Sequence, residues 1–395
     1  MAVYLDNAAT TALRAEALDA MLPYLRAEYA NPSSPHSSGQ RVRRALDEAR
    51  ERTAAAIGAR PAEIVFTGSG SEADNLALFG LVAAGAGRGH LIISAIEHHA
   101  VLHAADVVRA RGHTVTTLPV DRDGFVSEDA LAGALEANAG ATLVSVMHAN
   151  NEIGTIERIE RLAAIAHARR ALFHTDAVQT VGHIGVDVKA LGVDALSLSA
   201  HKFEGPKGVG ALYVRSGVHP APLIHGGGQE GGRRAGTENV AGVVGLATAL
   251  DLAVRSVARH AAATSALRDE LIESVLARIP GSALNGSRSE RLPNNASLRF
   301  DGIDGQTMVL ALDVVGFEVS TGSACTSGSL EPSHVLTAAG LDAAQARGTV
   351  RFSLGRGTTK ADIASLLSHL PGMIERLRSL SAALVPGGGP SRARE

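Results

Sequence analysis

The sequence predicts an α/β protein in which a mostly parallel sheet is covered by helices on both faces and is followed by a smaller α+β domain. Short runs rich in β-branched residues alternate with alanine-rich runs of helical length, a rhythm typical of parallel strands joined by helical crossovers. The strands expected at residues 143–147 and 195–199 carry no charged residue, as strands buried on both faces do. After Arg255 the pattern changes to a long amphipathic helix followed by short strands and loops.

The expected elements follow in order along the chain. Seven strands are predicted in the larger domain, at residues 63–67, 90–94, 114–119, 142–148, 172–176, 195–199 and 211–215. Helices are predicted between them at residues 71–84, 100–111, 128–137 and 158–170, and a last helix at residues 360–379. We therefore expect a larger domain over residues 15–258, a smaller one over residues 259–385, and a disordered Gly/Pro-rich tail at residues 386–395.

The composition excludes several classes of protein. Net charge is -3 and the charged residues are scattered, so no strong field invites nucleic acid or a membrane surface. The apolar run at residues 240–250 stops at Asp251 and is too short to span a bilayer. The N-terminus has no export-signal pattern, and a chain with a single cysteine cannot form an internal disulfide. We therefore expect a cytoplasmic protein.

Lys202 is the first candidate catalytic residue. It follows the buried strand at residues 195–199 and precedes a glycine-containing turn, so it would face the crevice where open α/β sheets bind ligands. Partial burial there would lower its pKa and make its amine available for a Schiff base. From Lys202 alone, a surface lysine beside a glycine turn is an equally good interpretation.

A carboxylate at a second strand end favours the catalytic interpretation. The strand at residues 172–176 ends in Asp176, and Gln179 follows three residues later. Pyridoxal 5'-phosphate chemistry needs a carboxylate against the ring nitrogen, because the protonated ring is the electron sink. Asp176 would supply that carboxylate and Gln179 would hold the ring hydroxyl. Asp176 would also serve as a helix N-cap, and the two roles are compatible.

The phosphate of such a cofactor needs oriented donors. Gly70 and Ser71 lie where a strand passes through a glycine turn into a helix, so that backbone N–H groups would face an anion. A Gly-Ser-Gly turn is a weak signal alone. Ser199 and His201, close to Lys202 in sequence, would add further donors.

Taken together, the motifs resemble those of a known family. In order along the chain they are Asn7-Ala8-Ala9-Thr10-Thr11, Asn31-Pro32-Ser33-Ser34, Glu97-His98-His99-Ala100-Val101, Asn150-Asn151-Glu152-Ile153-Gly154, Asp176 with Gln179, and Ser199-Ala200-His201-Lys202. They continue with His225-Gly226-Gly227-Gly228-Gln229-Glu230, Arg234-Ala235-Gly236-Thr237, Gly322-Ser323-Ala324-Cys325-Thr326-Ser327 and Val350-Arg351-Phe352-Ser353-Leu354-Gly355-Arg356. From about residue 4 to residue 380 the chain resembles the cysteine desulfurases of the class-V pyridoxal enzymes, the IscS- and NifS-like group.

The resemblance implies a fold-type I homodimer with active sites at the subunit interface, in which residues 1–14 join the smaller domain. It also implies a role for each matched residue. Lys202 would bind the cofactor covalently, Asp176 would pair with the ring nitrogen, and His98 would stack on the ring. The phosphate would be held by Gly70, Ser71, Ser199 and His201, with Thr237 arriving from the partner subunit. The ring hydroxyl region would contact Gln179 and Asn151, and the substrate carboxylate would bind Arg351, joined by Asn31.

The chain departs from these relatives in three places. Gly70-Ser71 stands where relatives often have Ala-Thr, and Gly231 stands where they usually carry an arginine. The Gly/Pro-rich tail does not resemble the segment that IscS-type enzymes use to hold a scaffold protein. The resemblance therefore leaves the sulfur acceptor open. Candidate acceptors are proteins of iron–sulfur cluster assembly and of tRNA or DNA thiolation.

Cys325 is the predicted nucleophile. A lone cysteine is more often a small buried hydrophobe, but its neighbours here are Gly, Ser and Thr, which predict a mobile loop. A mobile thiol near the cofactor would attack the sulfur of bound L-cysteine and leave as a persulfide, with L-alanine as the other product. Lys202 would move the α-proton, and His98 would relay protons.

Other functions remain open. A selenocysteine lyase would share nearly every residue, whereas an aminotransferase has no use for Cys325. An inactive scaffold of the same fold predicts damage at Lys202, Asp176 or Cys325, and all three are present. A dehydrogenase is disfavoured because no G-x-G-x-x-G follows the first strand. The histidine spacing suggests no metal site.

Overall fold

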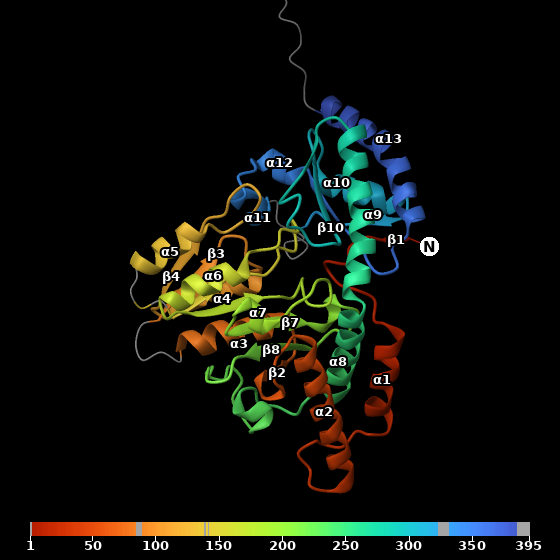
Figure 1. Cartoon of the computed structure of the whole chain (residues 1–395). Helices are drawn as coiled ribbons and strands as arrows, with labels where there is room; N and C mark the ends of the chain where they lie inside the picture. The colour runs from red at the N-terminus through yellow and green to blue at the C-terminus, as the bar shows by residue number, and fades with distance from the viewer. Residues whose placement is uncertain (1, 84–88, 138–139, 141, 323–331, 385–395) are drawn as a thin grey trace, which may run out of the picture.

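The computed structural model describes residues 2–83, 89–137, 140, 142–322 and 332–384, and its centre is a seven-stranded sheet (Figure 1). The strand order is β2-β8-β7-β6-β5-β3-β4, and β8 runs antiparallel to both of its neighbours whereas β3 to β7 are parallel. The strands are β2 Ile64–Thr67, β3 His90–Ser94, β4 Thr114–Leu118, β5 Leu143–Ser145, β6 Leu172–Asp176, β7 Ala195–Ser199 and β8 Gly210–Val214.

All seven predicted strands are present, although the one predicted at residues 142–148 is shorter. It ends at Ser145, while the amides of Val146 and His148 still donate to backbone carbonyls of β6, at 3.2 and 2.8 Å. The apolar pattern continues past the strand because Val146 and Met147 are also buried. The longer strand was predicted because buried apolar residues continue beyond the last residue with strand geometry.

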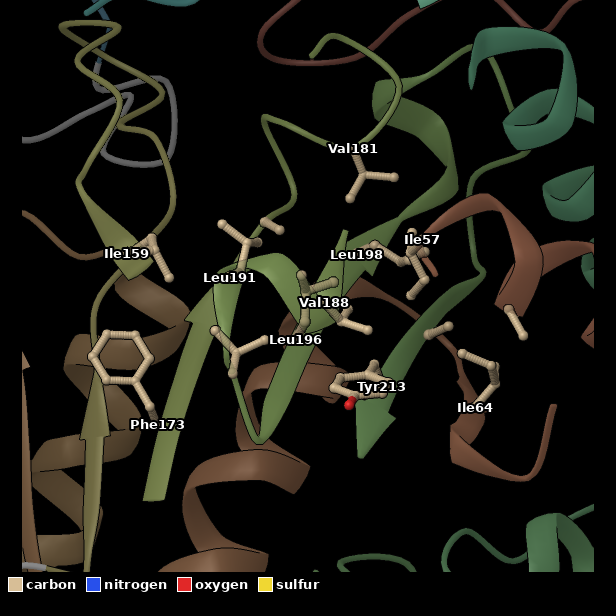
Figure 2. Close-up of a cluster of buried hydrophobic side chains, with 14 of the residues drawn as sticks. Ile57, Ile64, Ile159, Phe173, Val181, Val188, Leu191, Leu196, Leu198 and Tyr213 are labelled. Atoms are coloured by element: carbon tan, nitrogen blue, oxygen red, sulfur yellow. The ribbon is translucent and has the colours of Figure 1, made fainter. Parts of the chain in front are cut away.

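Alternating side chains of the strands pack into two separate cores, one on each face of the sheet. Ile64 and Phe66 of β2 belong to the first core, whereas Val65 between them belongs to the second. Figure 2 shows part of the first core, where Phe173, Leu196 and Tyr213 come from three adjacent strands. The central strands of the sheet are thus buried on both faces, which explains why β5 and β7 carry no charged residue.

Helices from different parts of the chain cover the two faces. The first core takes side chains from α2 Ser37–Ala56, α5 Glu128–Ala137, α6 Ile159–Ala168, α7 Val188–Leu191 and α8 Val240–Arg255. The second takes them from α3 Gly70–Ala83 and α4 His99–Ala110. The helix α1 Ala15–Arg26 lies against α8. The four helices predicted between the strands are confirmed: the one at residues 128–137 has the predicted bounds, and the ends of the other three are shifted by one or two residues.

A third core gathers the C-terminal part of the chain with the N-terminus, above the large sheet in Figure 1. It contains Leu5 beside side chains of the strands β10 Asn295–Phe300 and β12 Thr349–Ser353, which pair antiparallel. The remaining strands here are β9 Ser282–Leu284, on β10, and β1 Val3–Tyr4, parallel to β11 Phe317–Glu318. The helices are α9 Val257–Arg278, α10 Gly305–Val314, α11 His334–Ala338, α12 Ala343–Arg347 and α13 Lys360–Leu384. We propose that residues 15–258 form the larger domain and that residues 1–14 together with 259–385 form the smaller one.

No single helix among the described residues is long and apolar enough to cross a membrane. The consecutive helices α8 and α9 reach the required length and composition only as a pair, and they are bent by 71° relative to each other.

Candidate active site

Predicted site residues converge at the carboxyl ends of the parallel strands. Asp176 ends β6, Ser199 ends β7, and Lys202 closes the short 3-10 helix Ala200–Lys202 that follows. They line a cavity of about 290 Å³ with side chains that follow β2, β3 and β5. Among the described residues, the lining is Ala8, Ala9, Ser69, Gly70, Ser71, Asp74, His98, Met147, Asn151, Asp176, Val178, Gln179, Ser199, His201, Lys202, Gly322 and Arg351.

The N-terminal segment holds the lysine. Lys202 Nζ donates to the carbonyl oxygens of Ala8 and Ala9, at 2.7 and 2.8 Å. On the other side of the turn, His183 Nε2 lies 2.8 Å from the carbonyl oxygen of Lys202. The amine of Lys202 is therefore oriented within the cavity by a segment almost 200 residues away in sequence.

Asp176 lies at the base of the cavity and is 5% exposed. Its Oδ1 accepts a hydrogen bond from the backbone N–H of Val178 at 2.9 Å. Burial raises the pKa of the Asp176 carboxyl to about 6, although the Val178 hydrogen bond and nearby Lys202 act in the opposite direction. Gln179 Nε2 donates to the carbonyl of Ala8 at 3.0 Å, which fixes the amide beside Asp176.

Two neutral histidines flank Lys202. His98 is the N-cap residue of α4, and its Nδ1 accepts from the N–H of Ala100 at 3.1 Å, which leaves the ring proton on Nε2. Burial, and then the charge of Lys202, lower the pKa of His98 to about 4. The same two causes lower the pKa of His201 to about 4, and its Nδ1 lies 3.1 Å from Thr10 Oγ1. Both rings are therefore uncharged at neutral pH.

The end of the cavity near β2 has the features of an anion site. Gly70 and Ser71 begin α3, a 14-residue helix, so that its positive end faces the cavity with the hydroxyl of Ser71. A Cβ at Gly70 would lie 2.9 Å from Val178 Cγ2 and 3.2 Å from the Cβ of Ser199. The absence of a Cβ at Gly70 thus lets the start of α3 pack closely against Val178 and Ser199.

Arg351 is buried opposite this end and is 2% exposed. Its Nη1 donates to the carbonyls of Asn151 and Gly322, at 3.0 and 3.2 Å, and its Nη2 donates to Asp6 Oδ1 at 2.7 Å. Nε is buried without a hydrogen-bond partner among the described atoms. A planar guanidinium held in this way is suited to a carboxylate.

Two predicted residues do not line the cavity, and a third lies outside the described residues. Asn31 is exposed and its Oδ1 accepts from the N–H of Ser33 at 2.8 Å. Thr237 is exposed in the loop before α8. Cys325 lies outside the described residues, and Gly322, three residues before it, is part of the cavity lining.

The loop before Thr237 explains one departure in sequence. Gly231 has a φ of +66°, between Glu230 at +49° and Gly232 at +79°. Any residue with a side chain at Gly231 would be strained in this conformation. The glycine there therefore suits a left-handed turn that Glu230 anchors to β2.

Several lining residues were not predicted, above all Asp74. This aspartate is 1% exposed and lies one helical turn after Gly70 in α3. Its spacing of four residues from Gly70 places both on one helix face, a signal available in the sequence. Ala8 and Ala9 could not be found that way, because they contribute carbonyl groups rather than side chains.

Within the described ranges, no group of three or more His, Cys, Asp or Glu residues is arranged to hold a metal ion.

Comparison with known proteins matches most of the chain. The family model for aminotransferase class-V matches residues 3–366. A curated protein from Dictyoglomus turgidum, "Cysteine desulfurase IscS", is 52% identical over 380 residues, which is 96% of each chain. A solved structure named "NIFS-LIKE PROTEIN" superposes with a TM-score of 0.89 at 36% identity, covering 95% of this chain and all of that one. Another, "SspA in complex with cysteine", has a TM-score of 0.78 at 36% identity and covers 90% of this chain and 99% of the other.

Proposed function

The chain belongs to the aminotransferase class-V family, and on this premise we propose that it is a cysteine desulfurase, which converts L-cysteine to L-alanine and leaves the sulfur as a persulfide on Cys325. The predicted family and fold type are confirmed by these relatives. The observation that carries the site proposal is that Lys202, Asp176 and Arg351 line one cavity together with Gly322, three residues from the only cysteine of the chain.

The residues of the cavity fit pyridoxal 5'-phosphate as cofactor. Asp176 is a buried carboxylate with a raised pKa, which a protonated ring nitrogen would stabilise as the anion. The start of α3, where Gly70 packs closely against Val178 and Ser199, would hold the phosphate through Ser71, Ser199 and His201. Lys202 would attach the cofactor, His98 would stack on its ring, and Gln179 with Asn151 would contact its hydroxyl. When bound, this cofactor supplies an electron sink for the bonds of the substrate α-carbon.

The side chains supply binding and proton transfer. Arg351 binds the carboxylate of L-cysteine, assisted by Asn31, and thereby orients the α-carbon. Lys202 Nζ, aligned by the carbonyls of Ala8 and Ala9, takes the α-proton and returns it to the product. His98 carries its proton on Nε2 and exchanges it with the substrate.

Cys325 performs the sulfur transfer. Its thiolate attacks the substrate sulfur, so that an S–S bond forms while the carbon–sulfur bond breaks and its electron pair goes to the β-carbon. That carbon takes a proton, and L-alanine leaves. The reaction of L-cysteine with the Cys325 thiol to give L-alanine and a persulfide balances without an external oxidant.

The complete enzyme we propose is a cytoplasmic homodimer in which Thr237 serves the phosphate site of the partner subunit. The exposure of Thr237, away from the cavity of its own chain, supports this assignment. The persulfide then passes to an acceptor protein of iron–sulfur cluster assembly or of tRNA or DNA thiolation.

The test compares wild type with Cys325→Ser in the presence of a thiol reductant, while the absorbance of the bound cofactor is recorded. Wild type should make sulfide and alanine in equal amounts, and the variant should keep the absorbance band but make neither. A colourless protein would remove the cofactor assignment, and a fully active variant would remove the role of Cys325. Formation of a keto acid would point to an aminotransferase, and strong preference for selenocysteine to a lyase.

A further inference from the structure

A second aspartate, Asp74, lies beside Asp176 in the cavity and has no role in the mechanism above. It comes from α3 and is 1% exposed, and its Oδ1 is buried without a hydrogen-bond partner among the described atoms. Two carboxyl groups thus line the same cavity and interact electrostatically, where one suffices for a ring nitrogen. The arrangement needs a physical account, because two buried carboxylates side by side repel each other.

Behind Asp74 runs a chain of buried polar groups that carries no positive charge. The ring of His174 lies with Nδ1 2.9 Å from Ser145 Oγ and with Nε2 3.0 Å from Ser197 Oγ. The same Nε2 is 3.8 Å from Asp74 Oδ1. His174, Ser145 and Ser197 are all 0% exposed, and burial lowers the pKa of His174 to about 3. The ring is therefore neutral and cannot pair with an ionised Asp74.

The remaining neighbours also disfavour a charge on Asp74. Burial raises the pKa of Asp74 well above its usual range, and the carboxyls of Asp176 and then Glu97 act in the same direction, opposed by the hydroxyl of Ser197. Glu97 is itself fully buried, and burial raises its pKa to about 8. Among the three carboxyls, Asp176 has a nearby cation, Lys202, in addition to the N–H of Val178.

We propose that Asp74 is a positioning residue that holds the proton of an Asp74–Asp176 pair, so that the single negative charge rests on Asp176, opposite the ring nitrogen of the cofactor. The inference rests on the proposed function for the ring nitrogen alone. A neutral Asp74 leaves Asp176 as the single negative charge of the pair. That charge determines whether the ring nitrogen stays protonated.

The test is an infrared difference spectrum between the cofactor-loaded native protein and Asp74→Asn at neutral pH, in water and in heavy water. The native protein should show the carbonyl stretch of a protonated carboxyl, sensitive to heavy water, which Asp74→Asn lacks. Glu97→Gln is the matched control, since it should remove a different carboxyl band and leave that of Asp74. If the only band that Asp74→Asn removes is that of an ionised carboxylate, the proposal is overturned.

A second readout separates this role from a purely structural one. Asp74→Asn replaces a neutral acid by a neutral amide of the same shape, so cofactor affinity near pH 7 should change by less than about threefold. At the pH where native Asp74 loses its proton, the native cofactor absorbance should show an inflection that the variant lacks. Equal titrations over the whole stable range would contradict the proposal. The infrared comparison of the cofactor-free proteins still tests the protonation of Asp74 if the protein binds no cofactor, so failure of the proposed function is recognised separately.

Discussion

At the scale of single residues, Asp176 is held in an environment that opposes its own charge. Burial raises its pKa to about 6 despite nearby Lys202, and the protonated ring nitrogen of the proposed cofactor would supply a further cation that stabilises the ionised form. The cofactor-free protein therefore carries a destabilising group at the position where the cofactor binds. Binding offsets that cost, which links the stability of the fold to occupancy of the site.

Asp176→Asn should change how the stability of the cofactor-free protein depends on pH. The carboxyl binds its proton more tightly in the folded state, with a pKa of about 6, than in the unfolded state, near 3.9. Its contribution to the free energy of unfolding is therefore about zero below pH ~4, decreases as pH rises to ~6, and is constant above that pH. The total loss is up to about 3 kcal/mol. Urea unfolding at several pH values between 4 and 7 should show this loss in the native protein and less of it in the variant. If the free energy of unfolding depends on pH equally in the two proteins, burial does not raise the pKa of Asp176.

Arg351→Lys should weaken substrate binding and leave the cofactor in place. The lysine keeps the positive charge but loses the planar pair of donors now placed by Asn151, Gly322 and Asp6. Loss of one hydrogen bond to a charged group corresponds to about a tenfold to hundredfold rise in KM for L-cysteine. The control is Arg356→Lys, outside the cavity and paired with Glu204, which should leave KM nearly unchanged. An unchanged KM in Arg351→Lys would remove Arg351 as the carboxylate site.

At the scale of elements, the loop that carries Thr237 is fastened to the sheet by one buried ion pair. Glu230, in the 3-10 helix Gln229–Gly232, accepts two hydrogen bonds from Arg50 of α2, at 2.6 and 2.8 Å, and one from the N–H of Phe66 in β2 at 2.9 Å. Its side chain is 1% exposed and that of Arg50 is 15% exposed. The backbone strain of Glu230, with φ +49°, persists because these bonds determine its position.

Glu230→Gln should therefore destabilise the protein by about 3 kcal/mol, because it leaves a largely buried guanidinium without its counter-charge. The matched control is Glu28→Gln, which breaks the pair of Glu28 (side chain 32% exposed) with Arg41 (side chain 47% exposed) and should cost less than about 1 kcal/mol. Chemical unfolding of the two variants measures the difference. Equal losses would show that burial of the Arg50–Glu230 pair has no energetic weight.

At the scale of the whole molecule, the N-terminal segment joins the parts of the site. Leu5 packs in the C-terminal core, Asn7 Nδ2 donates to the carbonyl of Ser353 at 2.9 Å, and Thr11 N donates to the carbonyl of His201 at 2.9 Å. Ala8 and Ala9, between them, contact Lys202. The first dozen residues thus connect the core around β10 and β12 to the turn that carries the lysine.

The proposed dimer predicts complementation between two defective subunits. In a mixed dimer of Lys202→Ala with Thr237→Val, the only intact Lys202 would face the native Thr237 of the other subunit. That site should therefore bind pyridoxal 5'-phosphate with native affinity, which purification of mixed dimers through two different tags and titration of the absorbance band would measure. If Thr237 acts within its own chain, the mixed dimer will instead show the weakened affinity of Thr237→Val.

Sequence patterns located most of the elements because the signals are local. The central buried strands are short runs with few charges. Asp176 ends one such run and Lys202 follows another by three residues, so their meeting at one edge of a parallel sheet follows from geometry. The end of the strand predicted at residues 142–148 was wrong, because burial continues beyond Ser145 where the ladder stops. The roles of His98, Asn151 and Arg351 came from resemblance, since their own surroundings in sequence carry no such signal.

The sequence by itself determined the fold class, the strands and the residue types placed at their carboxyl ends, because periodicity, charge and glycine turns act over a few residues. Only the tertiary structure decided the strand order β2-β8-β7-β6-β5-β3-β4, the reversed β8, the pairing of Arg351 with Asp6 and the meeting of Asp74 with Asp176. Such contacts join segments up to 345 residues apart. The entropy of closing a loop grows only slowly with its length, so separation along the chain says little about which distant segments meet. The packing of the three cores decides that instead.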